Sequence, residues 1–310
     1  MGDRVKIFAP ASASNLGPGF DVLGLALEHP GDVIEAELAA ASGVEIVEVT
    51  GADSLTTDPD RNVAGIAARA ALRRLGPDGP GVRLWLHKRM PLASGLGSSA
   101  ASSVAAAVAV NQLLGGPLSE DDILRCALDG ETAVSGGAHA DNVAPSVLGG
   151  IVLVRSCEPL DLVRLPVPED LRVAVVHPHA TVKTEDARRL VADRRFEIQQ
   201  AVVNLGNIAA LVSALHTGDL ELLGRSISDA LVEPIRAPLV PAFADVKKSA
   251  TAAGALGCSI SGSGPSVFAF AASDVVANAV AYAMQGAFET AGLPSDRYVG
   301  RVNAQGAHLI

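Results

Sequence analysis

The chain has 310 residues, of which 49% are hydrophobic and 3% aromatic, so its core must be built mainly from Ala, Val, Leu and Ile. This length favours two domains. The net charge of −10 argues against nucleic acid and anionic membranes as main partners. Cys126, Cys157 and Cys258 are far apart and odd in number, and no basic segment precedes an apolar one at the amino terminus. We therefore expect a cytoplasmic protein with reduced thiols and no membrane span.

The first half of the chain alternates predicted strands with predicted helices. The strands, recognised by alternating apolar residues or short apolar runs, are expected over residues 5–10, 33–38, 44–49, 82–87 and 151–154. The helices are expected over residues 58–75, 98–114 and 119–130. Residues 135–148 are expected to form a loop.

The second half mixes the same two kinds of element. A composition break at residues 157–170, acidic and with three prolines, predicts a boundary between domains of residues 1–158 and 159–310. Strands are expected over residues 172–176, near Ser259, and over 267–270 and 298–302. Helices are expected from Glu185, over 201–215, up to Gly254 and over 275–288. Both halves together predict an α+β fold.

One segment carries more functional information than any other. It reads Pro91-Leu92-Ala93-Ser94-Gly95-Leu96-Gly97-Ser98-Ser99-Ala100-Ala101 and opens an Ala-rich helix. Small residues let backbone N–H groups approach a ligand, and the first turn of a helix offers unpaired donors and the positive end of the helix dipole. The sequence therefore predicts a phosphate site, with the hydroxyls of Ser98 and Ser99 available to a phosphate-bound magnesium ion.

Other phosphate-loop patterns fit this segment less well. It matches the loose dinucleotide pattern G-x-G-x-x-A, but the acidic residue expected about 20 positions later falls in the helix start at residues 119–122. A Walker loop needs Gly-Lys-Ser/Thr, which the chain lacks. A Rossmann dehydrogenase is therefore the weakest alternative.

Two more loops of small residues, 12–21 and 261–266, have the same chemistry and are expected to face the same ligand. Glu131 and the segment His139-Ala140-Asp141-Asn142 offer oxygen ligands for magnesium. The alternative, which the sequence favours less, is that Glu131 is a solvated helix end and His139 a surface residue.

Three residues of the second half suit substrate contacts. Thr184 is an expected helix N-cap, and Arg188 follows one turn later on the same face. Arg236 lies between two prolines, on a stiff segment that suits a carboxylate clamp. The sequence His177-Pro178-His179 could suggest a metal site. No third ligand lies nearby in the sequence, however, so we interpret these histidines as structural.

In this order the motifs resemble those of the GHMP small-molecule kinases. The resemblance rests on residues 9–21, 91–101, 137–145 and 259–266 and spans nearly the whole chain. It implies an amino-terminal domain akin to the second domain of ribosomal protein S5 and a ferredoxin-like carboxy-terminal domain. Residues 9–21 and 137–145 are most similar to the members that transfer the γ-phosphoryl group of ATP to the side-chain hydroxyl of L-homoserine, a step towards threonine.

The resemblance implies a role for each candidate residue on the donor side. Residues 91–101 wrap the ATP phosphates, with Gly262 nearby and Asn62 close to the adenine. Ser98, or its neighbour Ser99, and Glu131 hold Mg²⁺. Thr184 meets the γ-phosphate.

On the acceptor side it implies that Asn15, Arg188 and Arg236 grip the carboxylate of homoserine and that Asp21 holds its ammonium group. Asp141 and Asn142 lie near the reacting hydroxyl, in the segment with His139 that faces the acceptor. Because phosphoryl transfer depends chiefly on alignment and charge neutralisation, we expect Asp141 and Asn142 to orient this hydroxyl. The family also suggests a homodimer.

Two alternatives remain open at this point. One is a kinase of the same family acting on another alcohol, such as mevalonate or a sugar. The other is a nucleotide-binding regulator without catalysis, although such a protein need not retain Glu131, Ser98 and Thr184.

Overall fold

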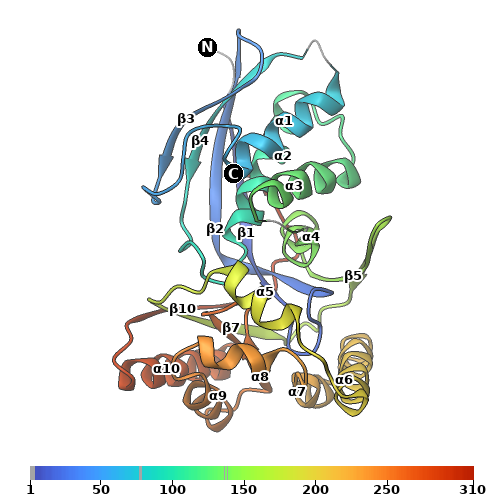
Figure 1. Ribbon diagram of the computed structural model, residues 1–310, viewed down its shortest axis with the longest axis vertical. Coiled ribbons are helices and arrows are strands. Elements are labelled where there is room, and N and C mark those ends of the chain that lie inside the picture. Colours follow the sequence, from blue (N-terminus) through green and yellow to red (C-terminus); the bar gives the residue numbers. More distant parts are fainter. Residues whose placement is uncertain (1–3, 77–78, 136, 138) are drawn as a thin grey trace.

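The structure is a computed structural model that describes residues 4–76, 79–135, 137 and 139–310. Its two halves lie one above the other along the longest axis, each with a sheet and helices of its own (Figure 1). The position of Ala138, within the predicted acceptor motif, lies outside the described residues.

The first sheet contains the strands β1 to β6 and β11. In the described chain its order is β11-β1-β2-β4-β3, with β5 and β6 continuing beside β2. The strands are β1 (Val5–Ser14), β2 (Leu23–Ala39), β3 (Val44–Thr50), β4 (Gly81–His87), β5 (Ile151–Cys157), β6 (Leu160–Leu165) and β11 (His308–Leu309). All neighbours are antiparallel except β3 and β4, which helix α1 connects.

Four helices cover one side of this sheet (Figure 1). They are α1 (Val63–Leu75), α2 (Ser98–Leu113), α3 (Glu120–Ser135) and α4 (Ala140–Leu148). Helix α2 is buried almost all round, and its alanines let α1 and α3 pack close to it. This central position fixes the amino-terminal end of α2 within the molecule.

The second sheet has the order β10-β7-β9-β8 with every neighbour antiparallel. Its strands are β7 (Arg172–Pro178), β8 (Gly257–Ile260), β9 (Val267–Ala271) and β10 (Ser295–Gly300). Its helices are α5 (Thr184–Ala192), α6 (Ile198–Thr217), α7 (Leu220–Ser226), α8 (Glu233–Arg236), α9 (Phe243–Ala252) and α10 (Asp274–Thr290). Numbered within this half, the strand order is 4-1-3-2, as in the ferredoxin-like fold. The α+β prediction is confirmed.

Several predicted bounds were wrong. Strand β1 continues to Ser14, through the start of the loop predicted over residues 12–21, β2 begins at Leu23 instead of residue 33, and β10 spans Ser295–Gly300 instead of residues 298–302. Helix α1 begins at Val63 because residues 58–62 form turns, in which the Asp58 carboxylate accepts a bond from a backbone N–H. Helix α3 continues to Ser135, so Glu131 lies inside it and is buried. Helix α4 replaces most of the loop predicted over residues 135–148, with Pro145 inside the helix.

The predicted division at residue 158 falls within a hairpin of the first sheet. Strand β6 follows that position and pairs with β5, and β11 returns from the end of the chain to pair with β1. The second half of the chain therefore contributes to both sheets.

Candidate active site between the two halves of the chain

A cavity of about 290 Å³ lies where the three small-residue loops meet. Both halves of the chain line it. Of the predicted site residues, its lining includes Asn15, Asp21, Asn62, Leu92, Ala93, Ser94, Gly95, Gly97, Ser98, Ser99, Glu131, His139, Asp141, Asn142, Thr184, Arg188, Arg236 and Gly262. The predicted loop residues Pro91, Leu96, Ala100 and Ala101 are not part of this lining.

Hydrogen bonds to backbone carbonyls hold the three loops together. The Ser12 N–H donates to the Leu96 carbonyl at 3.0 Å, and the Ser261 hydroxyl donates to the Gly95 carbonyl at 2.7 Å. Gly95 has φ +77°, and a Cβ atom there would lie 2.3 Å from the Ser261 carbonyl oxygen. Only glycine fits this approach, so the predicted phosphate-binding loop at residues 91–97 (the phosphate loop) depends on the loop at residues 261–266 for its shape.

The phosphate loop leads directly into α2. Its N-cap is Gly97 with φ +64°, and no side chain of the described residues caps the helix. The N–H groups of the first turn have no carbonyl partner within the helix and no capping side chain in the described part of the chain. They are therefore available to an anion at the edge of the cavity. Ser98 and Ser99 line the cavity beside them.

The sequence interpretation missed a buried ion pair behind this helix turn. The Lys88 ammonium, at the end of β4, contacts the Asp32 carboxylate of β2, and their side chains are 2% and 1% exposed. Lys88 also donates to the Ser98 carbonyl at 2.9 Å and to the Ser102 hydroxyl at 2.7 Å. Burial lowers the pKa of Lys88, and Asp32 opposes that shift. A lysine therefore reaches the first turn of α2, although the loop itself contains none.

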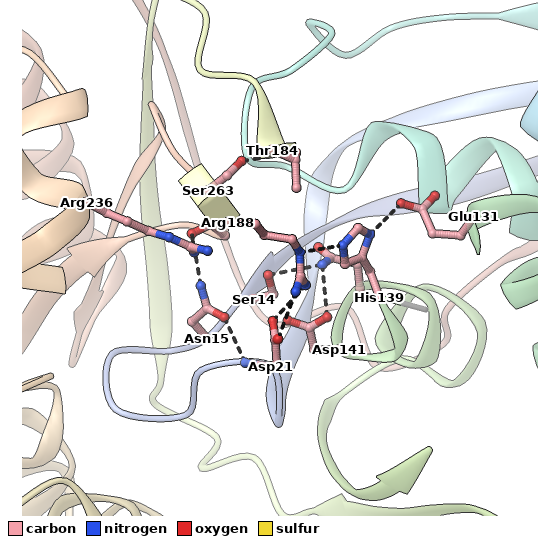
Figure 2. A network of polar contacts seen from close by, with 12 residues as sticks. Ser14, Asn15, Asp21, Glu131, His139, Asp141, Thr184, Arg188, Arg236 and Ser263 are labelled. Atoms are coloured by element: carbon pink, nitrogen blue, oxygen red, sulfur yellow. Dashed lines mark hydrogen bonds and ion pairs between the residues drawn. The ribbon is translucent and has the colours of Figure 1, made fainter. Parts of the chain in front are cut away.

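Four residues form a continuous polar chain along one wall (Figure 2). Glu131 of α3 contacts the His139 Nδ1 atom at 2.9 Å. The Arg188 Nε atom of α5 donates to His139 Nε2 at 3.0 Å, and its two terminal nitrogens donate to both oxygens of Asp21 at 3.1 and 3.0 Å. Arg188 and Asp21, predicted to hold opposite ends of the acceptor, are thus paired with each other.

Asp141 and Asn142 lie in the first turn of α4, and Asp141 lies close to Asp21 and Ser14 in Figure 2. Asn142 accepts from the Ser12 hydroxyl at 2.8 Å and donates to the Ser14 hydroxyl at 3.1 Å, which fixes its amide. Burial, together with the nearby charge of Asp21, raises the pKa of Asp141 from 3.8 to about 6. Such a carboxyl is closer to neutrality than a surface aspartate.

Arg236 and Asn15 converge on one carbonyl. Arg236 Nη1 and Asn15 Nδ2 both donate to the Gly262 oxygen, at 3.0 and 2.9 Å. Asn15 and Asp21 have positive φ values of 72° and 58°, which Asn and Asp tolerate better than other non-glycine residues. The buried Arg236 Nε atom has no partner among the described residues, and burial lowers the pKa of this guanidinium. Arg236 therefore retains a free donor.

Two residues that the family resemblance assigns to the nucleotide have local contacts within the protein. The Asn62 side chain caps α1 by accepting from the Ala64 N–H at 3.0 Å. Thr184 is the first residue of α5, where Lys183 is the N-cap, so its predicted capping role was wrong. Its hydroxyl lies 3.4 Å from that of Ser263 and lines the cavity.

The chain matches two family profiles, "GHMP kinases N terminal domain" over residues 62–150 and "GHMP kinases C terminal" over residues 211–290. The fold and the cleft at the phosphate loop define a small-molecule kinase of this type, and the chain belongs to the GHMP kinase family. The predicted family and fold class are confirmed. Kinases of this family use ATP as the phosphoryl donor.

Its relatives include homoserine kinases of similar length. One from Chlorobium phaeobacteroides strain BS1 is 44% identical, with 98% of each chain covered, and one from Arabidopsis thaliana is 44% identical over 99% of this chain and 84% of that one. The crystal structure of homoserine kinase from Cytophaga hutchinsonii is 48% identical, covers 100% of this chain and 98% of that one, and has a TM-score of 0.97.

Proposed function

We propose that the protein transfers the γ-phosphoryl group of ATP to the side-chain hydroxyl of L-homoserine, a step towards threonine. The observation that carries this proposal is the arrangement of charges on the acceptor side. Asp21 and Asp141 lie beside Arg188 and Arg236 on one cavity. An acceptor with an ammonium, a carboxylate and a hydroxyl needs such a mixed set. The similarity to homoserine kinases over nearly the whole chain supports the same substrate.

On the donor side, the residues fit a magnesium ion. The Glu131 Oε2 atom is buried and has no partner among the described residues, while its Oε1 atom accepts from the Ser99 hydroxyl at 3.0 Å. A buried carboxylate oxygen without a partner is costly unless a cation or donor meets it. Glu131 and the hydroxyl of Ser98 or Ser99 would hold Mg²⁺, which prefers oxygen ligands and neutralises phosphate charge when bound.

On the acceptor side, the free Nε donor of Arg236 suits the homoserine carboxylate, with Asn15 beside it. The partly exposed Asp21 carboxylate suits the ammonium group. Asp141 and Asn142 would then face the hydroxyl, held by the serines of β1. Because the transition state of phosphoryl transfer is loose, orientation and charge neutralisation supply most of the catalysis.

The proposal is tested by measuring ADP release with L-homoserine, mevalonate and galactose as acceptors. We expect turnover with homoserine at a kcat/KM at least about 10³-fold above the other two, because a site that pairs ammonium and carboxylate groups rejects acceptors lacking them. Turnover with another alcohol alone would contradict the substrate. ATP binding without turnover of any acceptor would indicate a regulator.

We also propose a homodimer formed through α6. The side chains of Ile198, Val202 and Leu205 are 71%, 60% and 66% exposed, and their spacing places them on one helix face. The helix carries no charged residue, and by length and composition it could also cross a membrane. Its opposite face is fixed to the protein, since the buried Asn204 donates to the Pro18 carbonyl at 2.8 Å. A second copy would cover the apolar face without crowding charges of an acidic chain.

Sedimentation velocity tests this interface. We expect a dimer for the unmodified chain and a monomer for Leu205→Glu, with Lys248→Glu on α9 as a control that leaves the dimer intact. A monomeric unmodified chain, or binding of α6 to lipid vesicles, would contradict the proposal. Location in the cytoplasm is likewise our proposal, and it agrees with the free state of all three cysteines.

A further inference from the structure

His139 has both of its ring nitrogens occupied. Arg188 can only donate, so its Nε–H requires His139 Nε2 to be the acceptor. The hydrogen of the neutral ring therefore lies on Nδ1, which donates to the Glu131 carboxylate at 2.9 Å. The side chain is 7% exposed. No ring nitrogen is left over for a direct bond to an acceptor molecule.

The bond from His139 also determines which oxygen of Glu131 is available. Oε1 accepts from both His139 and the Ser99 hydroxyl, whereas Oε2 is buried without a partner among the described residues. Two donors on one oxygen hold the carboxylate in a single orientation. The free oxygen is the one that would meet the metal in the proposed function.

The other end of the same chain of contacts reaches the acceptor. Arg188 makes a bidentate pair with Asp21, and their side chains are 37% and 40% exposed. Both line the cavity. An ammonium group that binds Asp21 competes with Arg188 for the same two oxygens, and any shift of the guanidinium changes its contact with His139.

We propose that His139 is a positioning residue that links the acceptor's ammonium site at Asp21 to the metal-side carboxylate of Glu131, through Arg188. This inference rests on the proposed function. Its consequence is that the acceptor and the magnesium nucleotide bind with mutual dependence: each changes the affinity of the other by the same factor. We expect a factor of about ten, within the range of about 5 to 150 typical of such coupling.

Isothermal titration with the magnesium complex of a non-hydrolysable ATP analogue, with and without saturating L-homoserine, measures this factor. In His139→Asn the amide can replace Nδ1 as the donor to Glu131, but nothing replaces Nε2. We expect the nucleotide Kd of this variant to stay within about threefold of normal and to become independent of homoserine. In His139→Ala we expect weaker nucleotide binding as well as loss of the dependence on homoserine.

Ser99→Ala is the matched control. It also removes one donor to Glu131 Oε1 but has no link to Arg188. We expect weaker binding of the magnesium nucleotide and an unchanged coupling factor. Thermal unfolding of each variant verifies that it is folded at the titration temperature.

Three results would overturn the inference. The first is an unmodified enzyme that turns over homoserine but shows no coupling between homoserine and the magnesium nucleotide. The second is a His139→Asn variant that keeps the full coupling factor. The third is a set of His139 variants in which only the Kd of homoserine rises, because that result indicates direct contact between His139 and the substrate. Failure of the proposed function looks different, because the unmodified enzyme would then neither bind nor phosphorylate homoserine.

Discussion

Asp141 lines the cleft, and Asp32 lies buried beside it. Replacing Asp141 by asparagine should raise the free energy of unfolding, whereas replacing Asp32 by asparagine should lower it. The pKa of Asp141 is raised from 3.8 to about 6, mainly by burial and then by the charge of Asp21. A raised pKa means that the folded state binds the proton more tightly than the unfolded state, so ionisation destabilises the fold as pH rises from about 4 to above 6. A shift of this size corresponds to about 3 kcal/mol at pH 8.

Asp141→Asn removes that cost while keeping an oxygen to accept from the Asn142 amide, which lies 3.2 Å from Asp141 Oδ1. We expect the free energy of unfolding to rise by about 3 kcal/mol at pH 8, by slightly less at pH 6, and by only about 1 kcal/mol at pH 4.5. Asp32→Asn should instead lower it by about 3–5 kcal/mol, because the Lys88 charge is left buried without its partner.

Urea unfolding at pH 8, 6 and 4.5, followed by the fluorescence of Trp85, the only tryptophan, provides the measurement. A variant of Asp141 that is less stable than the unmodified chain at pH 8 would refute the reasoning, as would a gain that does not change with pH. In the same preparation, a kcat within about tenfold of normal indicates orientation of the hydroxyl. A loss of about 10³-fold or more indicates a general base.

Two further substitutions test the acceptor clamp and the phosphate loop. Arg236→Lys should raise the KM for homoserine at least about tenfold and leave the KM for ATP nearly unchanged, because lysine lacks the planar guanidinium fork. An unchanged KM for homoserine would show that Arg236 does not belong to the acceptor site. Gly95→Ala should lower kcat/KM for ATP more than about 100-fold, since its Cβ would collide with Ser261. Gly116→Ala, at the same φ of +77° but with open space around it, is the control and should affect only stability.

The sequence predicted the features whose signals are local. The small-residue loop before α2, the buried Ala-rich helix and the strand alternation in residues 82–87 depend on neighbouring residues, and the structure has these three elements where they were expected. Helix α4 was predicted as a loop because His139, Pro145 and several small residues resemble loop composition. Tertiary packing against β1 and β2 overrides that local preference, since six of its first eight side chains are apolar or small and almost all are buried.

Long-range pairs were beyond the sequence. Nothing in the separate segments around Asp32 and Lys88 indicates that two strands bring them together behind α2. The same holds for Arg188 and Asp21, which were assigned to opposite ends of one ligand and instead contact each other. Charge and residue type predicted which side chains belong to the cleft, whereas the partners of each depend on strand register and loop geometry.

The connection between β8 and β9 contacts both the proposed donor side and the proposed acceptor side of the cleft. On the donor side, the Ser261 hydroxyl and the Ser266 N–H bind carbonyls of the phosphate loop at 2.7 and 3.2 Å. On the acceptor side, the Gly262 carbonyl receives bonds from Asn15 and Arg236. A displacement of this connection would therefore disturb both sides at once. The first half of the chain contains the phosphate loop, and the second half supplies the two contacts from Ser261 and Ser266 to it, beside the bond from the Ser12 N–H to the Leu96 carbonyl. The proposed phosphoryl transfer needs close alignment of donor and acceptor, and this one short connection contacts residues proposed to bind each of them.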